Sequence, residues 1–204
     1  IINNRKGTVL VTCFSSNISR IKSILDIAYR TDRSVLVVGR ALLRAIDAAK
    51  EVGFLKNIPD LLSLKDLSLI PRSNVLIIST GSQGEPNSAL SRISKNIDKF
   101  IKLIKGDTLI FSSRKIPGNE KAISKVQNRF LERGIEIITD DDKNVHVSGH
   151  PSRDELIEMY SYIKPKISIP VHGTREHIEA HADLASNCQV PNIVKPKNGE
   201  IIKL

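Results

Sequence analysis

Short apolar, β-branched runs alternate with amphipathic helical patterns through most of this chain. Gly7–Cys13 predicts a buried strand, and Ile18–Tyr29, with apolar residues at helical spacing, predicts a helix directly after it. The same strand-then-helix order recurs further along. Because parallel strands need crossover connections, usually helices, this alternation predicts a parallel sheet covered on both faces. The expected fold class is α/β, with a doubly wound, mostly parallel sheet.

The remaining elements of this first part can be placed from the same pattern. Strands are expected at Val35–Val38, Val75–Ser79, Leu109–Ser112 and Ile135–Thr139, and helices at Ala41–Val52, Asn87–Lys95 and Asn119–Arg133. The pattern leaves open whether the helix that starts at Asn87 stops near Lys95 or continues through Ile104. Residues 57–72, which carry two prolines around a leucine-rich stretch, receive no assignment.

The pattern changes after an acidic turn at Asp140–Asp142. The expected order is then a short strand, a helix, a strand, a helix and two short strands, at Val145–Val147, Arg153–Ile163, Lys166–Val171, Glu176–Ser186, Asn192–Lys195 and Glu200–Leu204. Ser152 and Glu155 have the spacing of a capping box at the first of these helices. Two domains are therefore expected, residues 1–140 and residues 141–204.

Positive charge is concentrated in the first part of the chain. The chain has 31 basic and 22 acidic residues and a formal charge of +9, with 23 basic against 12 acidic residues before position 140. Lys and Arg displace the counterions condensed on phosphates, so this part suits a polyanionic partner better than a cationic substrate. The alternative is a solvated lysine face that binds nothing.

Features of export or membrane insertion do not stand out. No run of about 18 apolar residues occurs, and the first residues lack the order of a signal peptide. Cys13 and Cys188 are too few for a disulfide framework, which favours a reducing, cytoplasmic location. The chain begins with Ile and enters a strand pattern at once, so we expect it to be a piece of a longer protein.

All five histidines lie between residues 146 and 181. The segment HVSGH places His146 and His150 in a connection before a helix, with Ser148 and Gly149 between them. Backbone N–H groups, a hydroxyl and a helix N-terminus suit an anionic phosphate, and His150 could protonate a leaving oxygen. The alternative is a glycine-containing turn with surface histidines.

The other three histidines follow an apolar strand pattern. His172 comes directly after the segment IPV and before a glycine, where α/β proteins often place ligands. A single histidine is not a metal site, because zinc takes three or four protein ligands. His177 and His181 are four positions apart without an intervening HExxH glutamate, so we favour a packed helix face for both.

Several segments together resemble the ribonuclease J family of metallo-β-lactamase-fold nucleases. The segments are CFSSNISRI, STGSQGEPNSALSRI, HVSGH with SRDEL, KPKISIPVHG and HIEAHADLA, and they cover nearly the whole chain in order. The resemblance implies that residues 1–140 are a β-CASP domain. Residues 141–204 would be the C-terminal return of the chain to a metallo-β-lactamase domain.

The same resemblance implies an activity and a set of site residues. The family cleaves RNA internally and from a 5′-monophosphate end, with two zinc ions, so single-stranded RNA is the implied partner and zinc the implied cofactor, with manganese or magnesium as alternatives. A phosphate-holding loop would consist of His146, Val147, Ser148, Gly149 and His150. Within it, His150 would be the catalytic histidine.

The resemblance also implies a metal ligand and two loops near the RNA. His172 would be a zinc ligand. The loop with Ser82, Gly84 and Glu85, and the turn Ser15–Asn17, would lie near the RNA. The alternative is that these residues only form helix caps and tight turns.

The departures from the family are also informative. The HxHxDH motif that binds metal is absent, so most zinc ligands would lie outside this chain, and this piece alone would be inactive. A C-terminal self-association domain is also missing, although the full-length protein is expected to form a homo-oligomer. Two alternatives stay open: a non-catalytic RNA- or nucleotide-binding α/β module and a flavodoxin-like regulatory domain.

Overall fold

Five parallel strands form the central sheet of the computed structural model, which describes residues 1–203. The strands are β1 (Val9–Thr12), β2 (Ser34–Val38), β3 (Val75–Ser79), β4 (Thr108–Phe111) and β5 (Glu136–Ile138), in the spatial order β2-β3-β1-β4-β5. β1 and β3 are buried along their whole length, as expected for strands covered on both faces. The predicted α/β fold with a doubly wound parallel sheet is confirmed.

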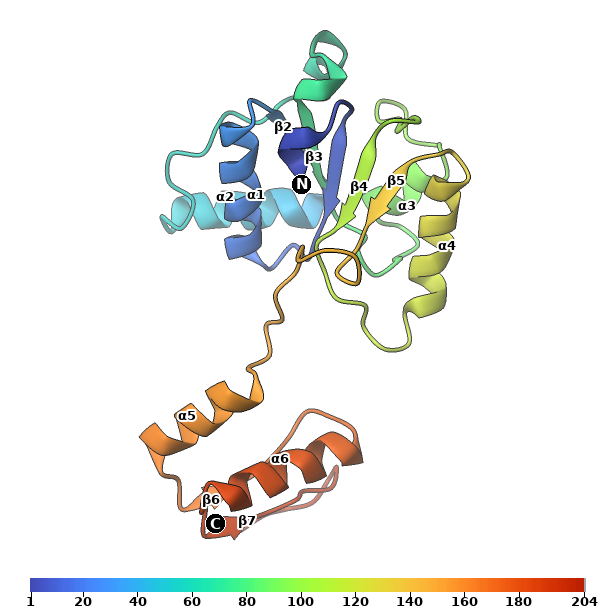
Figure 1. The fold of residues 1–204 in the computed structure, drawn as a ribbon. Coiled ribbons are helices and arrows are strands. Elements are labelled where there is room, and N and C mark those ends of the chain that lie inside the picture. Colours follow the sequence, from blue (N-terminus) through green and yellow to red (C-terminus); the bar gives the residue numbers. More distant parts are fainter. Residues whose placement is uncertain (204) are drawn as a thin grey trace. The chain divides into compact units, whose positions relative to one another are not determined.

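Two helices cover each face of this sheet (Figure 1). Helices α1 (Ile18–Arg30) and α2 (Arg40–Glu51) bury their apolar sides in one core layer, with β-strand residues such as Val9 and Val11. Helices α3 (Ala89–Ser94) and α4 (Glu120–Leu131) bury theirs in the other layer, around Phe130. Alternate residues of each strand thus feed opposite layers, which is the period-two pattern of a strand.

Residues 57–72, which received no assignment from the sequence, carry the chain from one face of the sheet to the other. Leu61 forms a parallel bridge to Val35 on the outer edge of β2, so the chain passes around this edge after α2. It then returns along the other face through the 3-10 turns η2 (Asp66–Leu69) and η3 (Arg72–Asn74) before β3 begins. A further 3-10 turn, η1 (Ile2–Asn4), precedes β1.

The strand order creates an opening at the carboxyl edge of the sheet. The helix after β1 packs on one face, whereas the helices after its neighbours β3 and β4 pack on the other. Open α/β sheets bind ligands where adjacent connections diverge in this way. A binding site is therefore expected at the loops after β1, β3 and β4.

Buried charges hold the opposite, amino edge of the sheet together. The Arg33 guanidinium is buried and donates to the backbone carbonyls of Gly7 and Val75, each at 3.0 Å. The Asp107 carboxylate accepts from the N–H of Thr8 at 2.8 Å and pairs with the guanidinium of Arg72. Buried charges are tolerated here because each has several hydrogen-bond partners.

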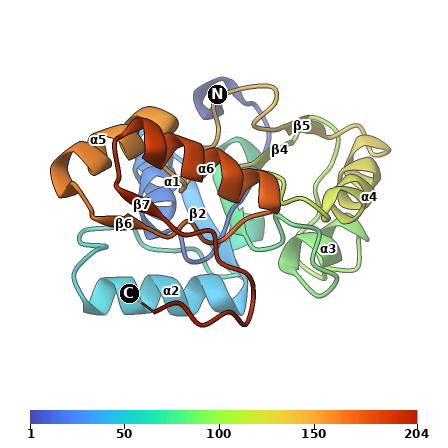
Figure 2. The same cartoon turned by 90° about the horizontal axis from the view of Figure 1, so that it is seen from below.

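The chain divides into two compact units, Ile1–Val147 and the residues from Ser148 onward. The second unit contains α5 (Arg153–Ile163), β6 (Ile167–Ser168), α6 (Arg175–Asn187) and β7 (Asn192–Ile193). β6 and β7 pair in parallel, and α6 runs alongside them (Figure 2). No helix in the described part of the chain is both long and apolar enough to cross a membrane.

Most predicted elements are present, and the differences have local causes. α5 has the predicted bounds and the predicted capping box of Ser152 and Glu155. The continuation through Ile104 is wrong, because α3 ends at Ser94 and Asn96 takes a left-handed φ of 58°. Residues 145–147 and 200–203 form no strand, and residue 204 lies outside the described residues.

Candidate functional site

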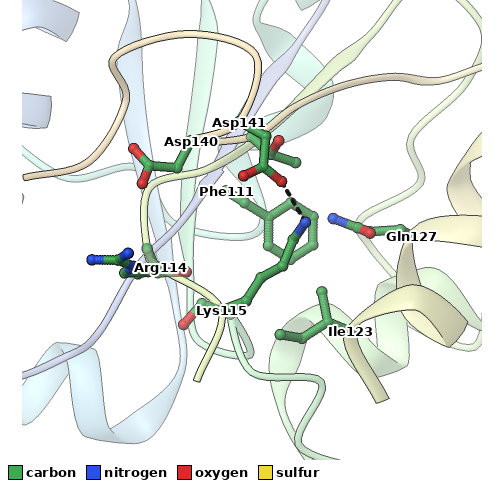
Figure 3. Close-up of a pocket in the computed structure, with 10 residues that line it drawn as sticks. Phe111, Arg114, Lys115, Ile123, Gln127, Asp140 and Asp141 are labelled. Carbon is green, nitrogen blue, oxygen red and sulfur yellow. Dashed lines mark hydrogen bonds and ion pairs between the residues drawn. The ribbon is translucent and has the colours of Figure 1, made fainter. Parts of the chain in front are cut away.

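A small polar cavity opens at the carboxyl edge of the sheet, between the loops after β3, β4 and β5. Its volume is about 180 Å³, and its lining consists of Ser82, Phe111, Ser113, Arg114, Lys115, Ile123, Gln127, Thr139, Asp140 and Asp141. Lys115 reaches across it to Asp141 with an Nζ–Oδ2 distance of 2.5 Å (Figure 3). Arg114 points away from that pair, which leaves its guanidinium on the same side as Asp140.

Gln83 joins the loop after β3 to the loop after β4. Its buried side-chain amide donates to the Arg114 carbonyl at 2.9 Å and accepts from the Ile116 N–H at 3.0 Å. The Asn119 amide donates to the same Gln83 oxygen at 3.3 Å. The sequence reasoning missed Gln83, although it lies inside the quoted segment GSQGEP, because an amide has no titration or metal-binding pattern to detect.

The carbonyl of Val145 is anchored from two elements, which fixes the chain directly before His146. The Ser112 hydroxyl, at the end of β4, donates to this carbonyl at 2.6 Å. The Arg20 guanidinium, in the first turn of α1, donates to it at 3.3 Å. These two hydrogen bonds hold the backbone directly before His146 at the carboxyl edge of the sheet.

His146 itself is half-buried in the first unit. Its Nδ1 atom is buried and has no hydrogen-bond partner among the described residues. Burial lowers the pKa of His146, and the nearby Asp140 carboxylate opposes this shift. The imidazole is therefore predominantly neutral at pH 7, which leaves one ring nitrogen to accept and one to donate a hydrogen bond.

Val147 ends the first unit, and Ser148, Gly149 and His150 begin the second unit and lead into α5. The Ser148 hydroxyl accepts from the His150 N–H at 3.1 Å, and both residues are exposed. A Cβ added to Gly149 would meet no described atom within 4 Å, so packing does not require glycine there. Val147 is also exposed, which leaves the backbone of the segment accessible to a ligand.

Within the second unit, His150 and His172 lie side by side. Their ring centroids are 5.8 Å apart and the ring planes differ by 13°. His172 has a φ of 66°, a left-handed conformation that is uncommon for residues other than glycine. Such strained backbone is concentrated at functional sites, so the paired, exposed imidazoles are the strongest local candidate.

The other two histidines have structural partners: His177 is exposed and caps a helix rather than packing on a helix face, whereas His181 is half-buried. His177 Nδ1 accepts from the Thr174 N–H at 3.2 Å and closes a capping box at the start of α6. His181 Nε2 lies 3.0 Å from the Tyr160 hydroxyl, which also contacts the Ser168 hydroxyl at 2.7 Å. These contacts join α5, β6 and α6 within the second unit.

The residues that the resemblance placed near the RNA, in the loops after β1 and β3, have local structural roles. The Asn17 side chain caps α1 by accepting from the Arg20 N–H at 2.9 Å. The Glu85 carboxylate accepts from the Gln83 N–H at 3.0 Å, and Gly84 takes a left-handed φ of 75°. A Cβ on Gly84 would lie 2.5 Å from the Ala122 backbone, so the tight turn needs glycine.

The described residues do not form a zinc site by themselves. Among residues 1–203, no group of three or more His, Cys, Asp or Glu side chains is arranged to hold a metal ion. Zinc takes three or four protein ligands, so His172 could supply one imidazole at most to a larger ligand set.

Comparisons with known proteins define the class of protein to which this fold and these histidines belong. Residues 6–130 match the family model described as ribonuclease J, beta-CASP domain, and residues 134–196 match the Zn-dependent metallo-hydrolase RNA specificity domain. The second description implies a metal cofactor for this class. The chain belongs to the ribonuclease J family, which confirms the resemblance seen in the sequence.

Curated relatives match the chain along its whole length. Ribonuclease J of Sinorhizobium meliloti is 44% identical over 204 residues, and that of Mycolicibacterium smegmatis is 40% identical over 207 residues. Ribonuclease J of Helicobacter pylori is 33% identical over 208 residues. The matches cover 100% of this chain but only 36%, 37% and 30% of these relatives, so the chain spans about a third of their length.

Proposed function

We propose that this chain is the RNA-holding part of a ribonuclease J-type metallo-hydrolase, which cleaves RNA both internally and from the 5′ end. The observation that carries the proposal is that both family models match in order across one chain, with 44% identity to a ribonuclease J. In this proposal residues 1–140 are the β-CASP domain and residues 141–204 the C-terminal part of the metallo-hydrolase domain. This chain alone is inactive.

The proposed phosphate loop consists of His146, Val147, Ser148, Gly149 and His150. Its backbone N–H groups and the Ser148 hydroxyl can donate to phosphate oxygens, which suits the exposed backbone of Val147 and Gly149. The neutral His146 ring can donate one further hydrogen bond. His150 is proposed to stabilise charge on the phosphate or protonate the leaving oxygen.

His172 is proposed as one metal ligand, with the rest of the ligand set outside this chain. Two zinc ions are proposed for the intact site, with manganese or magnesium as substitutes. When bound, such ions would polarise the phosphate and lower the pKa of a water molecule. His150, stacked on His172, would then lie beside the metal ligand and face the same substrate.

The proposed substrate is single-stranded RNA with a 5′-monophosphate. Residues 1–147 carry 24 basic and 15 acidic residues, whereas the remaining residues carry seven of each, so the positive charge resides in the first unit. This charge supports phosphate-dominated binding with weak sequence preference. A cytoplasmic location and self-association of the full-length protein complete the proposal.

The decisive experiment is cleavage of a 5′-monophosphorylated single-stranded RNA. The full-length protein and this 204-residue chain are each assayed with zinc, with manganese and with a chelator. Cleavage by the longer protein alone, abolished by the chelator, is the expected result. Metal-dependent cleavage by the 204-residue chain would contradict the proposed inactivity, and chelator-resistant cleavage would contradict the metal requirement.

The alternative function is a non-catalytic RNA- or nucleotide-binding α/β module. The absence of a complete metal-ligand group among the described residues favours this alternative for the chain in isolation. The DNA sequence upstream of Ile1 distinguishes the two functions. An encoded HxHxDH motif supports the enzyme, and its absence leaves the binding module.

A further inference from the structure

A groove of about 430 Å³ lies in the first unit, near the amino edge of the sheet. One wall is the irregular stretch Leu64–Arg72, and the other is the segment Lys99–Leu103, which follows α3. Thr8 and Val75, at the amino ends of β1 and β3, also line it. The groove therefore uses none of the residues assigned to phosphate, catalysis or metal binding.

The floor of this groove is aliphatic and its mouth carries exposed apolar side chains. Val75, Ile77, Ile101 and Leu103 line it and are buried in the core. Phe100 lines it too, yet its side chain is 59% exposed. A concave aliphatic surface with one exposed aromatic residue suits apolar side chains of a partner, because filling it removes apolar area from water.

Two backbone N–H groups along one wall have no hydrogen-bond partner among the described residues. Burial alternates along this wall, with Phe100 and Lys102 exposed and Ile101 and Leu103 buried, as in an extended strand. The N–H groups of Lys102 and Leu103 make no hydrogen bond to any described residue. An apolar extended segment with unpaired backbone donors can accept another chain as an added strand.

The rim of the groove is positive. Lys65, Lys99 and Lys102 are exposed, and none of them forms an ion pair with a described residue. No carboxylate is among the residues that line the groove. The nearby Asp66 accepts from the Ser63 hydroxyl at 2.6 Å, and Asp98 accepts from the N–H groups of Phe100 and Ile101. The rim is thus complementary to an acidic partner.

We infer that this lysine-rimmed groove docks an extended, acidic segment of a partner protein, in which apolar side chains alternate with Asp or Glu. The apolar side chains would fill the aliphatic floor and the acidic ones would meet the three lysines. The segment's backbone would accept a hydrogen bond from the N–H of either Lys102 or Leu103, because successive N–H groups of an extended strand point to opposite edges. Single-stranded RNA fits less well, because Phe100 is the only aromatic residue of the lining and an aliphatic floor cannot stack bases.

The probe for this inference is a fluorescein-labelled peptide of alternating Leu or Phe and Asp or Glu residues, titrated with the full chain and followed by fluorescence anisotropy. The double variant Lys99→Glu and Lys102→Glu should weaken binding about tenfold or more, through repulsion of the acidic side chains. Phe100→Ala should weaken it about fivefold through lost apolar contact. These side chains are exposed, so both variants keep the core intact.

Matched controls lie on the other face of the sheet. Lys22→Glu with Lys50→Glu reverses the same charge on α1 and α2, and Phe54→Ala removes an aromatic ring that is 71% exposed. Both controls should bind the peptide as the parent chain does. A second peptide with lysine at the acidic positions should not bind.

Three results would overturn the inference. The first is no anisotropy change with the acidic peptide, and the second is equal weakening in groove and control variants. The third is that the groove variants lose affinity for a single-stranded RNA, or for vesicles of phosphatidylglycerol and phosphatidylcholine, while the peptide fails to bind. The readout is independent of RNA cleavage, so it also stands apart from the proposed function.

Discussion

His150 is the single residue on which the proposed chemistry depends most. Its ring is exposed and stacked on His172, and its backbone N–H is held by the Ser148 hydroxyl. The backbone bond survives replacement of the imidazole, so a substitution should remove chemistry without dismantling the loop. The strained φ of 66° at His172 supports the view that this pairing serves function more than stability.

The substitution His150→Ala in the full-length protein should therefore lower the cleavage rate about 100- to 10,000-fold, the range for loss of a general acid or base. RNA affinity should fall only a few-fold, because backbone and hydroxyl donors still hold the phosphate. Single-turnover cleavage and filter binding measure the two quantities. Unchanged turnover would remove the assigned role, and the matched control is the helix-capping His177→Asn.

The burial of His146 leads to a prediction of how the stability of the chain depends on pH. Burial lowers its pKa in the folded chain, so the unfolded chain binds more protons when the pH falls below the ordinary histidine value. Stability should therefore be fully present above about pH 6.5 and decline as the pH falls toward the lowered folded pKa. Urea unfolding from pH 7.5 to 5 measures this slope.

The variant His146→Gln should show a shallower loss of stability over the same pH range. The glutamine cannot take up a proton, so the contribution of this site to the slope disappears. The difference between the two chains is the informative quantity, because all other groups titrate in both. Identical slopes in the parent chain and the variant would contradict a lowered pKa at this position.

At the scale of elements, the carboxyl edge of the sheet is organised by polar side chains that tie loops to one another. Gln83 joins the loops after β3 and β4, and Ser112 joins the end of β4 to the segment before His146. Neither residue type is diagnostic in a sequence. A buried amide or hydroxyl becomes recognisable only when the backbone groups that it satisfies are known.

Replacing Gln83 by Ala should lower the free energy of unfolding by about 1 kcal/mol, because the Arg114 carbonyl and the Ile116 N–H lose their part-buried hydrogen bonds. Urea denaturation gives the change directly. Gln127→Ala is the control, since Gln127 lines the same cavity but forms none of these bonds, and its effect should stay within about 0.5 kcal/mol. Equal effects of the two substitutions would show that Gln83 does not join the loops.

At the scale of the whole molecule, the charge of the first unit predicts how RNA affinity responds to salt. Phosphate contacts release condensed counterions, so affinity should fall steeply and linearly on a logarithmic scale. With six to ten contacts, the loss between 50 and 200 mM salt is about 1,000- to 100,000-fold. Anisotropy titrations of a labelled single-stranded RNA provide the slope. An affinity that does not change with salt would exclude the electrostatic account.

The sequence determined the main features of this protein. Alternating strand and helix patterns indicated the doubly wound sheet, and α5 has the predicted bounds because its capping box is a local signal. The family was evident from segments such as GSQGEP and HVSGH. These features follow from periodicity and from local backbone chemistry, which depend on neighbours along the chain.

The tertiary structure decided the features that depend on neighbours in space. The role of residues 57–72 could be assigned only from the tertiary structure, in which Leu61 pairs with Val35 at the sheet edge and the chain crosses to the other face. Gln83 and the stacked pair of His150 and His172 likewise depend on segments that are distant in sequence. Contacts between residues that are distant in sequence leave no period or spacing in the sequence, because the packing of the folded chain decides which residues meet.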